Sequence, residues 1–171
     1  GMDPRIKGIV AKIDNPAYGL ATIQELRNAI FDFRKTGKPA VAYTETFGEF
    51  SAANGAYYLA TAFDQIYLQP SGDLGLTGLI MESLFLKGAL EKLDVNPRMD
   101  HRKQYKNAMN IFTEKNYTEA HREATKSLMD SRFQNLVKGI SEARKLTEEN
   151  VHDLFDHGLF SSQKALEVGF I

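Results

Sequence analysis

The stretch from Gly48 to Leu59 places the strongest constraint on the fold. It reads Gly-Glu-Phe-Ser-Ala-Ala-Asn-Gly-Ala-Tyr-Tyr-Leu and lies between two apolar runs, 39–45 and 65–69, that are typical of buried strands. Its small residues allow another backbone to approach closely, and from Asn54 the apolar spacing becomes helical. A strand, a tight turn and a helix that begins at the turn form the place where α/β folds put a nucleophile or an oxyanion site. The same small residues also suit plain packing of a helix on a sheet, so both interpretations stay open.

Strand and helix patterns alternate through the first hundred residues. Ile6–Ile13 is a short apolar run that ends at a turn signal, and Thr22 is placed to cap a helix that begins at Ile23. Because this helix leads into the 39–45 strand, the segment is a βαβ unit whose two strands should be parallel. Further strands are predicted at 65–68, at 74–81 with a bend, and at 95–99, with a helix over 85–93. The pattern predicts a wound α/β layer of mostly parallel strands.

The composition changes after residue 100. Residues 101–116 are polar and basic, which is typical either of a solvated linker or of a functional loop. One long helix is predicted over 118–145, followed by a shorter helix that Thr147 caps and Gly158 ends. A last short helix should begin near Ser161 or Ser162. The fold class is therefore α/β with a long C-terminal helix.

The totals exclude several classes of function. With 21 basic and 22 acidic residues, the chain has no overall field that would attract nucleic acid. The absence of cysteine excludes thiol catalysis and zinc-thiolate sites, the histidines lack metal-ligand spacing, and no phosphate-binding loop is present. We therefore expect no metal, no cofactor and no nucleic-acid partner. No apolar run approaches the ~20 residues of a membrane helix, so we expect this fragment to be soluble.

The 171 residues suit one domain. We interpret residues 1–2 as an expression remnant and residues 3–171 as a single α/β domain. Both ends of that domain are apolar, because the Ile6–Ile13 run comes almost at once and the chain closes on Phe170 and Ile171. We expect the chain to be an excised piece of a longer polypeptide.

Taken in order, these residues resemble the signal peptide peptidase A family, also called protease IV. Residues 52–59, Ala-Ala-Asn-Gly-Ala-Tyr-Tyr-Leu, are similar to the family's Ala-Ala-Ser-Gly-Gly-Tyr-Tyr turn. The segments 62–66, 74–78, 104–107 and 158–168 are also similar, and they occur in the same order and spacing. The resemblance implies a serine peptidase of the crotonase/ClpP-like fold.

The resemblance gives Lys106 a role, because this family cleaves peptide bonds with a Ser-Lys dyad and Lys106 falls at the position of the general base. A free amine with a pKa near ~10.4 is protonated at neutral pH, so it accepts a serine proton only after burial or a nearby cation lowers that pKa. Arg102 and Lys103 are cations close in sequence. Tyr105, Ile111 and Phe112 could provide dry surroundings. From the residues alone, Lys106 would be interpreted as one of many dispersed surface lysines, and it is the resemblance that favours the catalytic role.

Two positions depart from the family pattern. Asn54 stands where the nucleophilic serine should be, and a carboxamide cannot attack a carbonyl carbon. Ser51 lies three residues too early to replace that serine. The turn that supplies an oxyanion donor in the family contains Asn15, Pro16 and Ala17 here, and without paired glycines we expect an incomplete oxyanion hole.

A base without a nucleophile is what the amino-terminal half of the long tandem form of this family looks like. The resemblance then implies a carboxyl-terminal, serine-bearing domain of the same protein as partner, and a fragment that is inactive alone. It further implies a homo-oligomer, a ring or dome, that degrades cleaved signal peptides and other hydrophobic peptides at the bacterial cytoplasmic membrane, with the anchor outside this chain. Two alternatives stay open. One is an architectural or oligomerisation domain without a catalytic role, and the other is an acyl-CoA enzyme of the crotonase type with Glu45 or Glu49 as its acid.

Overall fold

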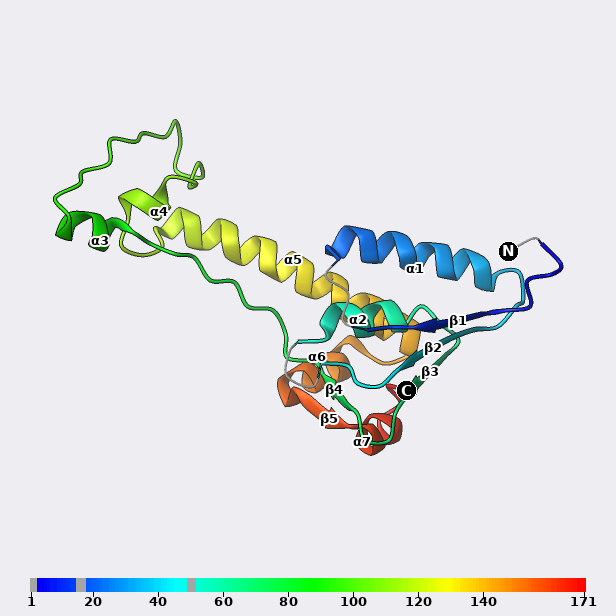
Figure 1. Ribbon diagram of the computed structural model, residues 1–171. Helices are drawn as coiled ribbons and strands as arrows, with labels where there is room; N and C mark the ends of the chain where they lie inside the picture. The colour runs from blue at the N-terminus through cyan, green and yellow to red at the C-terminus, as the bar shows by residue number, and fades with distance from the viewer. Residues whose placement is uncertain (1–2, 15–17, 49–51) are drawn as a thin grey trace. The chain divides into compact units, whose positions relative to one another are not determined.

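The computed structural model describes residues 3–14, 18–48 and 52–171 (Figure 1). The chain forms two compact units, and each is considered by itself. The sheet unit contains Gly1–Gly78 and Asn135–Ile171, and the insert unit contains Leu79–Gln134. The single domain expected from the sequence stays a prediction.

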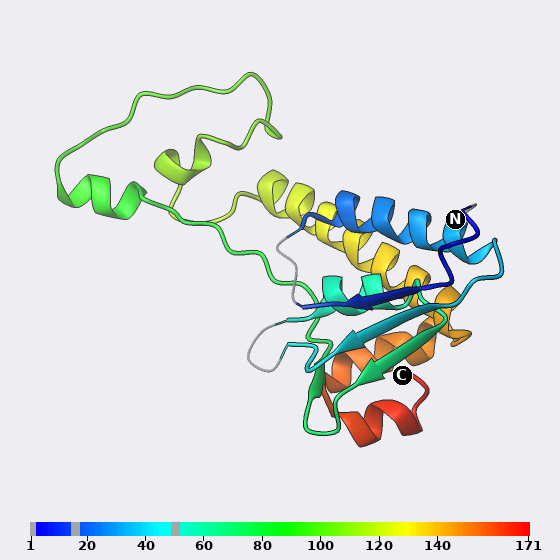
Figure 2. The same cartoon turned by 45° about the vertical axis from the view of Figure 1, so that its right-hand side comes forward.

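Three parallel strands organise the sheet unit. They are β1 (Ile9–Lys12), β2 (Ala40–Thr44) and β3 (Gln65–Leu68), in the order β1-β2-β3. Helix α1 (Leu20–Arg34) connects the first two strands, and α2 (Asn54–Ala60) connects the second and third. The predicted βαβ unit is confirmed, because Ile9 pairs with Ala40 and Ala42 pairs with Ile66 in parallel register. Figure 2 shows the three strands side by side, with β1 at one edge.

A second, smaller sheet joins distant parts of the sequence. Strand β4 (Asp73–Gly75) pairs antiparallel with β5 (Leu159–Ser161), which lies between α6 (Glu148–His157) and α7 (Ser162–Glu167). The bent strand predicted over 74–81 is wrong, because regular pairing ends at Gly75. The predicted length came from apolar residues, but a strand needs a pairing partner and β5 has only three residues.

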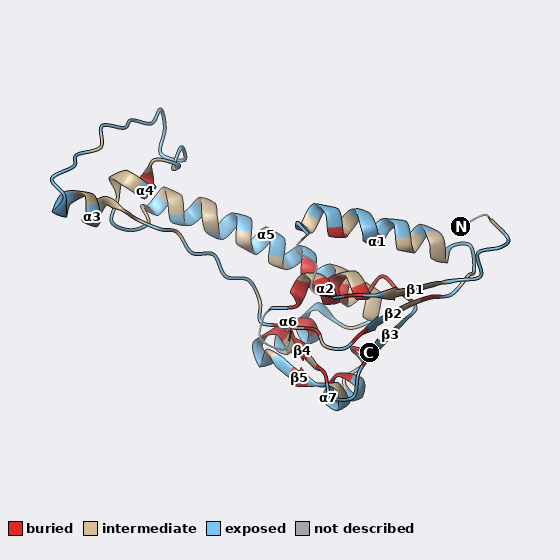
Figure 3. Ribbon diagram, in the orientation of Figure 1, coloured by how far each residue is buried: buried red, intermediate tan, exposed pale blue. Residues whose placement is uncertain are grey.

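The core of the sheet unit is an aromatic cluster around α2, where buried residues gather (Figure 3). Tyr57 makes edge-to-face contacts with Phe47 at 5.6 Å and with Phe170 at 5.3 Å between ring centroids. Phe170 in turn contacts Phe160 at 5.6 Å. Such pairs stabilise a core beyond their buried area. The small-residue turn of the sequence thus leads into the best-packed helix of this unit.

The predicted starts of the helices were only partly correct. Helix α6 begins as predicted, since the Thr147 side chain accepts a hydrogen bond from the Asn150 backbone N–H at 3.1 Å. Gly158 ends that helix with a positive φ of 84°. Helix α1, in contrast, begins at Leu20, after Gly19 and without a side-chain cap. The prediction that Thr22 caps it is wrong, because the extended backbone of Gly19 already starts the helical turn.

The insert unit has little buried surface. It contains α3 (Lys87–Lys92), α4 (Asn110–Thr113) and the first turns of α5 (Glu119–Arg144), whose remaining turns belong to the sheet unit. The predicted long helix is confirmed, whereas the predicted strand over 95–99 is absent, all of these residues being described. Throughout 79–134, which is described without a gap, Asn110 is the one buried residue. Large apolar side chains are open to water, such as Ile80 at 85% and Leu93 at 72% exposure.

The length of α5 raises the question of a membrane span. Charged side chains occur along the whole helix. In the part of the chain that the structure describes, no helix is both long enough and apolar enough to cross a bilayer.

Candidate functional site

Asn54 occupies the first position of α2, where the sequence indicated a reactive group. The preceding Ala53 backbone N–H donates to the Gly75 carbonyl at 3.0 Å, which ties the start of the helix to β4. The Asn54 side chain is 5% exposed, and its Nδ2 donates to the Gly78 carbonyl. Its Oδ1 is buried and has no hydrogen-bond partner among the described residues. The position therefore holds a packed carboxamide, which binds backbone and cannot act as a nucleophile.

A buried arginine fixes the far end of α2. Arg27 of α1 is 5% exposed and donates to the Tyr58 carbonyl and to Thr61 Oγ1. It also donates to the Gly139 carbonyl of α5 at 3.1 Å, and its guanidinium lies 3.8 Å from the centroid of the Tyr58 ring. Burial lowers the pKa of Arg27, but an arginine stays charged because its ordinary pKa lies far above neutrality. One cation thus joins α1, α2 and the last turns of α5.

The sequence analysis missed Arg27, although a signal was present. Arg27 follows Ile23 by four residues, and Ile30 follows Arg27 by three, so the arginine lies on the stripe of α1 that faces the core. A charged residue on such a stripe is buried only when it has hydrogen-bond acceptors. Those acceptors come from α2 and α5, which the pattern of α1 alone does not show.

Tyr57 anchors the same helix to the end of the chain. The side chain is fully buried, and its hydroxyl donates to the Phe170 carbonyl at 2.9 Å. Burial raises the pKa of Tyr57, so the hydroxyl stays protonated and serves as a hydrogen-bond donor. Helix α2 is therefore held by structural contacts, and its buried polar groups are not arranged for proton transfer.

Lys106 belongs to the insert unit, in the turn that precedes α4. Its side chain is exposed, and its backbone N–H donates to the Lys103 carbonyl at 2.9 Å. Among the described residues, no carboxylate lies within 4.0 Å of its ammonium group. The neighbouring Tyr105 is itself 50% exposed and Ile111 37%. The insert unit by itself leaves Lys106 in contact with water, and the catalytic role of this residue stays a prediction.

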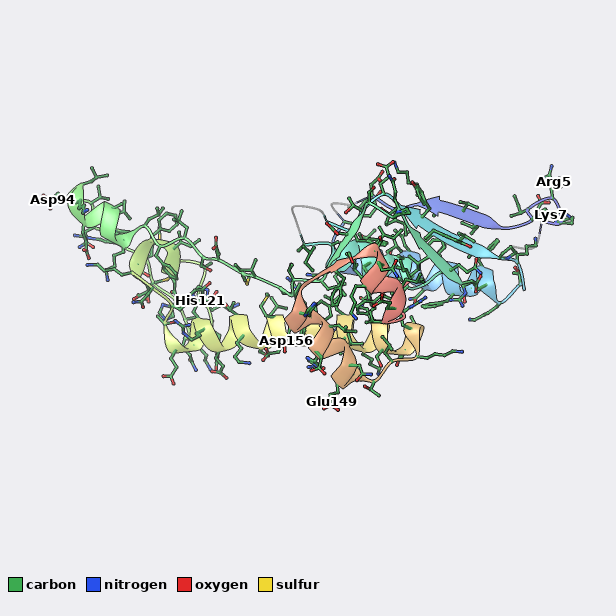
Figure 4. The ribbon with its side chains drawn as sticks, turned by 90° about the horizontal axis from the view of Figure 1, so that it is seen from below. Arg5, Lys7, Asp94, His121, Glu149 and Asp156 are labelled. Atoms are coloured by element: carbon green, nitrogen blue, oxygen red, sulfur yellow. The ribbon has the colours of Figure 1, made fainter. Side chains whose placement is uncertain are left out.

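Polar contacts attach the turn that carries Lys106 to α5. The Tyr105 hydroxyl donates to Glu123 Oε2 at 2.8 Å, and this hydrogen bond to a carboxylate raises the pKa of Tyr105. Asn110 Nδ2 lies 3.4 Å from Thr118 Oγ1 and 3.5 Å from Nδ1 of His121, which is labelled near the start of α5 in Figure 4. Contacts at Tyr105, before Lys106, and at Asn110, after it, therefore hold the chain on both sides of the lysine, although this segment contains little regular structure.

The structure does not bring the predicted site residues into one compact unit. Asn54 lies in the sheet unit and Lys106 in the insert unit. Glu45, a candidate acid for acyl-CoA chemistry, is exposed and forms an ion pair with Lys12 at 2.9 Å. No group of three or more potential metal ligands occurs in the ranges that the structure covers. Three predicted features lie outside the described residues: the oxyanion turn of Asn15, Pro16 and Ala17, and the alternatives Ser51 and Glu49.

Comparison with known proteins identifies the family. Residues 32–171 match the model of peptidase family S49. The chain is 31% identical over 169 residues to the chloroplastic serine protease SPPA of Arabidopsis thaliana, which covers 99% of this chain and 24% of the plant protein. It is 29% identical over 150 residues to protease 4 of Haemophilus influenzae, a match that covers 87% of this chain and 24% of that protein. It is 23% identical over 170 residues to a putative signal peptide peptidase of Enterococcus faecium, a match that covers 99% of this chain and 47% of that protein. The chain thus spans about a quarter of the length of the first two relatives. The match over most of its length confirms the resemblance and the wound α/β fold of the crotonase/ClpP type: the chain belongs to peptidase family S49.

Proposed function

We propose that this chain supplies the lysine general base of a Ser-Lys peptidase site whose serine comes from a second domain of a longer protein. One observation carries the proposal: the position where a nucleophile would begin α2 holds the buried, backbone-bound carboxamide of Asn54. Membership of a peptidase family supports peptide hydrolysis as the reaction of the whole protein. A chain that lacks the nucleophile at this position contributes only one half of such a site.

The exposed surface of the insert unit supports a partner domain. An isolated unit with open side chains such as Ile80, Leu84 and Leu93 has apolar surface available for docking. A domain that covers this surface would remove water from the neighbourhood of Lys106. Desolvation disfavours the charged form of an amine, so the neutral form would become available there. The neutral amine could then accept the proton of a serine hydroxyl as the serine attacks the peptide carbonyl.

The proposal extends to the whole protein. Its substrates would be hydrophobic peptides, including cleaved signal peptides, and its assembly would be a ring or dome of identical subunits associated with the bacterial cytoplasmic membrane. The name of the Enterococcus faecium relative, a putative signal peptide peptidase, supports this substrate class. Side-chain pockets along an extended peptide would provide the preference for apolar residues.

Two assays test the catalytic proposal. The 171-residue chain alone should not hydrolyse an unstructured protein such as denatured casein. In the longer peptidase that contains this chain, Lys106→Ala should abolish turnover. The control Lys138→Ala should retain it, because Lys138 is an exposed lysine of α5 that lies in the sheet unit, away from the turn of Lys106 in sequence. Turnover by the isolated chain that disappears in Ser51→Ala would contradict the proposal.

An architectural role is the second candidate. The exposure of Lys106 favours it, since a solvated lysine has no general-base function at neutral pH. In that case Lys106→Ala in the longer protein would leave turnover intact, and disruption of the exposed apolar surface of the insert unit would change its assembly.

A further inference from the structure

Asn110, at the start of α4, is the buried residue of the insert unit, and it is polar. Its side chain is 4% exposed, whereas every other residue over 79–134, a range described without a gap, is at least partly open to water. A buried carboxamide gives up its hydrogen bonds to water and keeps its place only if the protein replaces them. The partners of Asn110 therefore indicate what this side chain does.

The Asn110 carboxamide binds the start of α5. Its Nδ2 carries two N–H groups and has two acceptors, Thr118 Oγ1 at 3.4 Å and Nδ1 of His121 at 3.5 Å, the latter accepting when that nitrogen carries no proton. The Thr118 hydroxyl also accepts from the His121 backbone N–H at 3.2 Å, which is the arrangement of a helix N-cap. One buried side chain is thus bonded to the first turn of α5.

That first turn is itself held by a cluster of rings within the insert unit. The ring of Tyr117 lies 4.7 Å from that of His121 and 5.2 Å from that of Phe85, between centroids. The Tyr117 hydroxyl donates to Ser83 Oγ at 2.6 Å. The acceptors of Asn110 therefore belong to a packed part of this unit, near the His121 label in Figure 4.

The main chain of Asn110 leads back to Lys106. Its N–H donates to the carbonyl of Asn107 at 3.0 Å, and Asn107 directly follows the lysine. On the other side, the Lys106 N–H donates to the Lys103 carbonyl at 2.9 Å. The backbone is thus bonded before and after Lys106, while the lysine side chain stays exposed and available to a partner.

Such an arrangement suits a general base. A catalytic group works only when it is held within about 0.5 Å of its productive position. The long side chain of a lysine already loses much freedom when it is ordered, so a mobile backbone would add to that cost. A misplacement of about 1 Å lowers a rate by up to about a hundredfold.

We infer that Asn110 is the positioning residue for Lys106, because its buried carboxamide ties the turn of the lysine to the N-cap of α5 through Thr118. Asn110 does not meet the substrate, and it acts through the backbone that carries the base. The inference rests on the proposed function, since it assigns a task in the same reaction.

Kinetics of the longer peptidase that contains this chain test the inference. Asn110→Ala should lower kcat by about tenfold to a hundredfold and leave KM within about twofold, because substrate still binds while the base is misplaced. Thr118→Val removes the hydroxyl that Asn110 binds and should have a similar effect, whereas Thr118→Ser keeps that hydroxyl and should retain the parental kcat. The double variant should be no slower than the slower single variant, because both changes break one contact.

Thr147→Val is the matched control. It removes an N-cap hydroxyl of the same kind from α6, in the sheet unit, and should therefore cost a similar amount of stability while kcat stays parental. An equal loss of kcat in Thr147→Val and Thr118→Val would mean that general destabilisation explains the effect, and would overturn the inference.

Amide hydrogen exchange in the same protein reports the order of the turn without catalysis. The Lys106 N–H should exchange faster in Asn110→Ala than in the parent, and at the parental rate in Thr147→Val. Unchanged exchange in Asn110→Ala, or a parental kcat in Asn110→Ala beside an inactive Lys106→Ala, would overturn this inference and leave the proposed function standing. Full turnover of Lys106→Ala would overturn the proposed function and the inference with it.

Discussion

Replacement of Arg27 by methionine tests whether hydrogen bonds, rather than packing volume, hold α2 in place. Methionine keeps most of the aliphatic volume but removes every donor, which leaves the Tyr58 and Gly139 carbonyls without this partner. Hydrogen bonds from a charged donor contribute about 1.5–3 kcal/mol each. The buried guanidinium also carries its own desolvation cost, which its removal relieves, and the Thr61 hydroxyl still donates to the Tyr58 carbonyl at 2.8 Å. We therefore expect a net loss of about 2–4 kcal/mol.

Urea unfolding followed by far-ultraviolet circular dichroism measures this loss, since the chain has no tryptophan to report by fluorescence. At about 2–4 °C per kcal/mol for a chain of this size, the melting temperature should fall by roughly 4–16 °C. Lys35→Met at the end of α1 is the control, because Lys35 is exposed and its ion pair with Asp32 is on the surface, where such pairs contribute less than about 1 kcal/mol. Stability of Arg27→Met within about 0.5 kcal/mol of the parent would refute the reasoning.

Three further predictions concern single contacts. Gly139→Ala should destabilise the chain by about 1–3 kcal/mol in urea unfolding, because the added Cβ would overlap the Tyr58 ring. Thr147→Ala should cost about 1 kcal/mol in the same assay through loss of the N-cap of α6, and Thr147→Ser should restore most of it. The pKa of Glu167 should lie below its ordinary 4.5, since Lys164 donates a hydrogen bond to its carboxylate. Any stability from this pair is therefore present above pH 4.5 and disappears as the pH falls through the lowered pKa of Glu167. NMR titration of the Glu167 carboxylate measures this pKa, and an unchanged value in Lys164→Met would contradict the role given to Lys164.

Local patterns predicted the elements whose cause is local. The parallel βαβ order followed from alternating strand and helix periodicity, and the cap at Thr147 followed from a side chain that reaches a backbone N–H three residues later. The predicted strands over 74–81 and 95–99 failed because apolar composition alone does not provide a pairing partner. The short β5 was missed for the converse reason, since its pairing with β4 joins segments far apart in the chain.

The candidate site likewise combines features that the sequence predicts with features that only the structure shows. Asn54 was recognised from sequence as a residue that cannot be a nucleophile, because that conclusion depends on the chemistry of the side chain alone. Its burial and its bond to the Gly78 carbonyl became visible only in the structure. Lys106 was selected by resemblance, and the exposure of its side chain depends on which surfaces pack around the turn.

The sequence by itself determined the family, the parallel strand order and the absence of a serine at the start of α2, because each depends on residue identity and on neighbours along the chain. Only the tertiary structure decided that Arg27 is buried between three helices and that an apolar hollow lies between β1, α1 and α2. These features arise where α1, α2 and α5 or β1 meet in space. Burial and the pairing of polar groups depend on such contacts between distant segments, and no local pattern of residues encodes them.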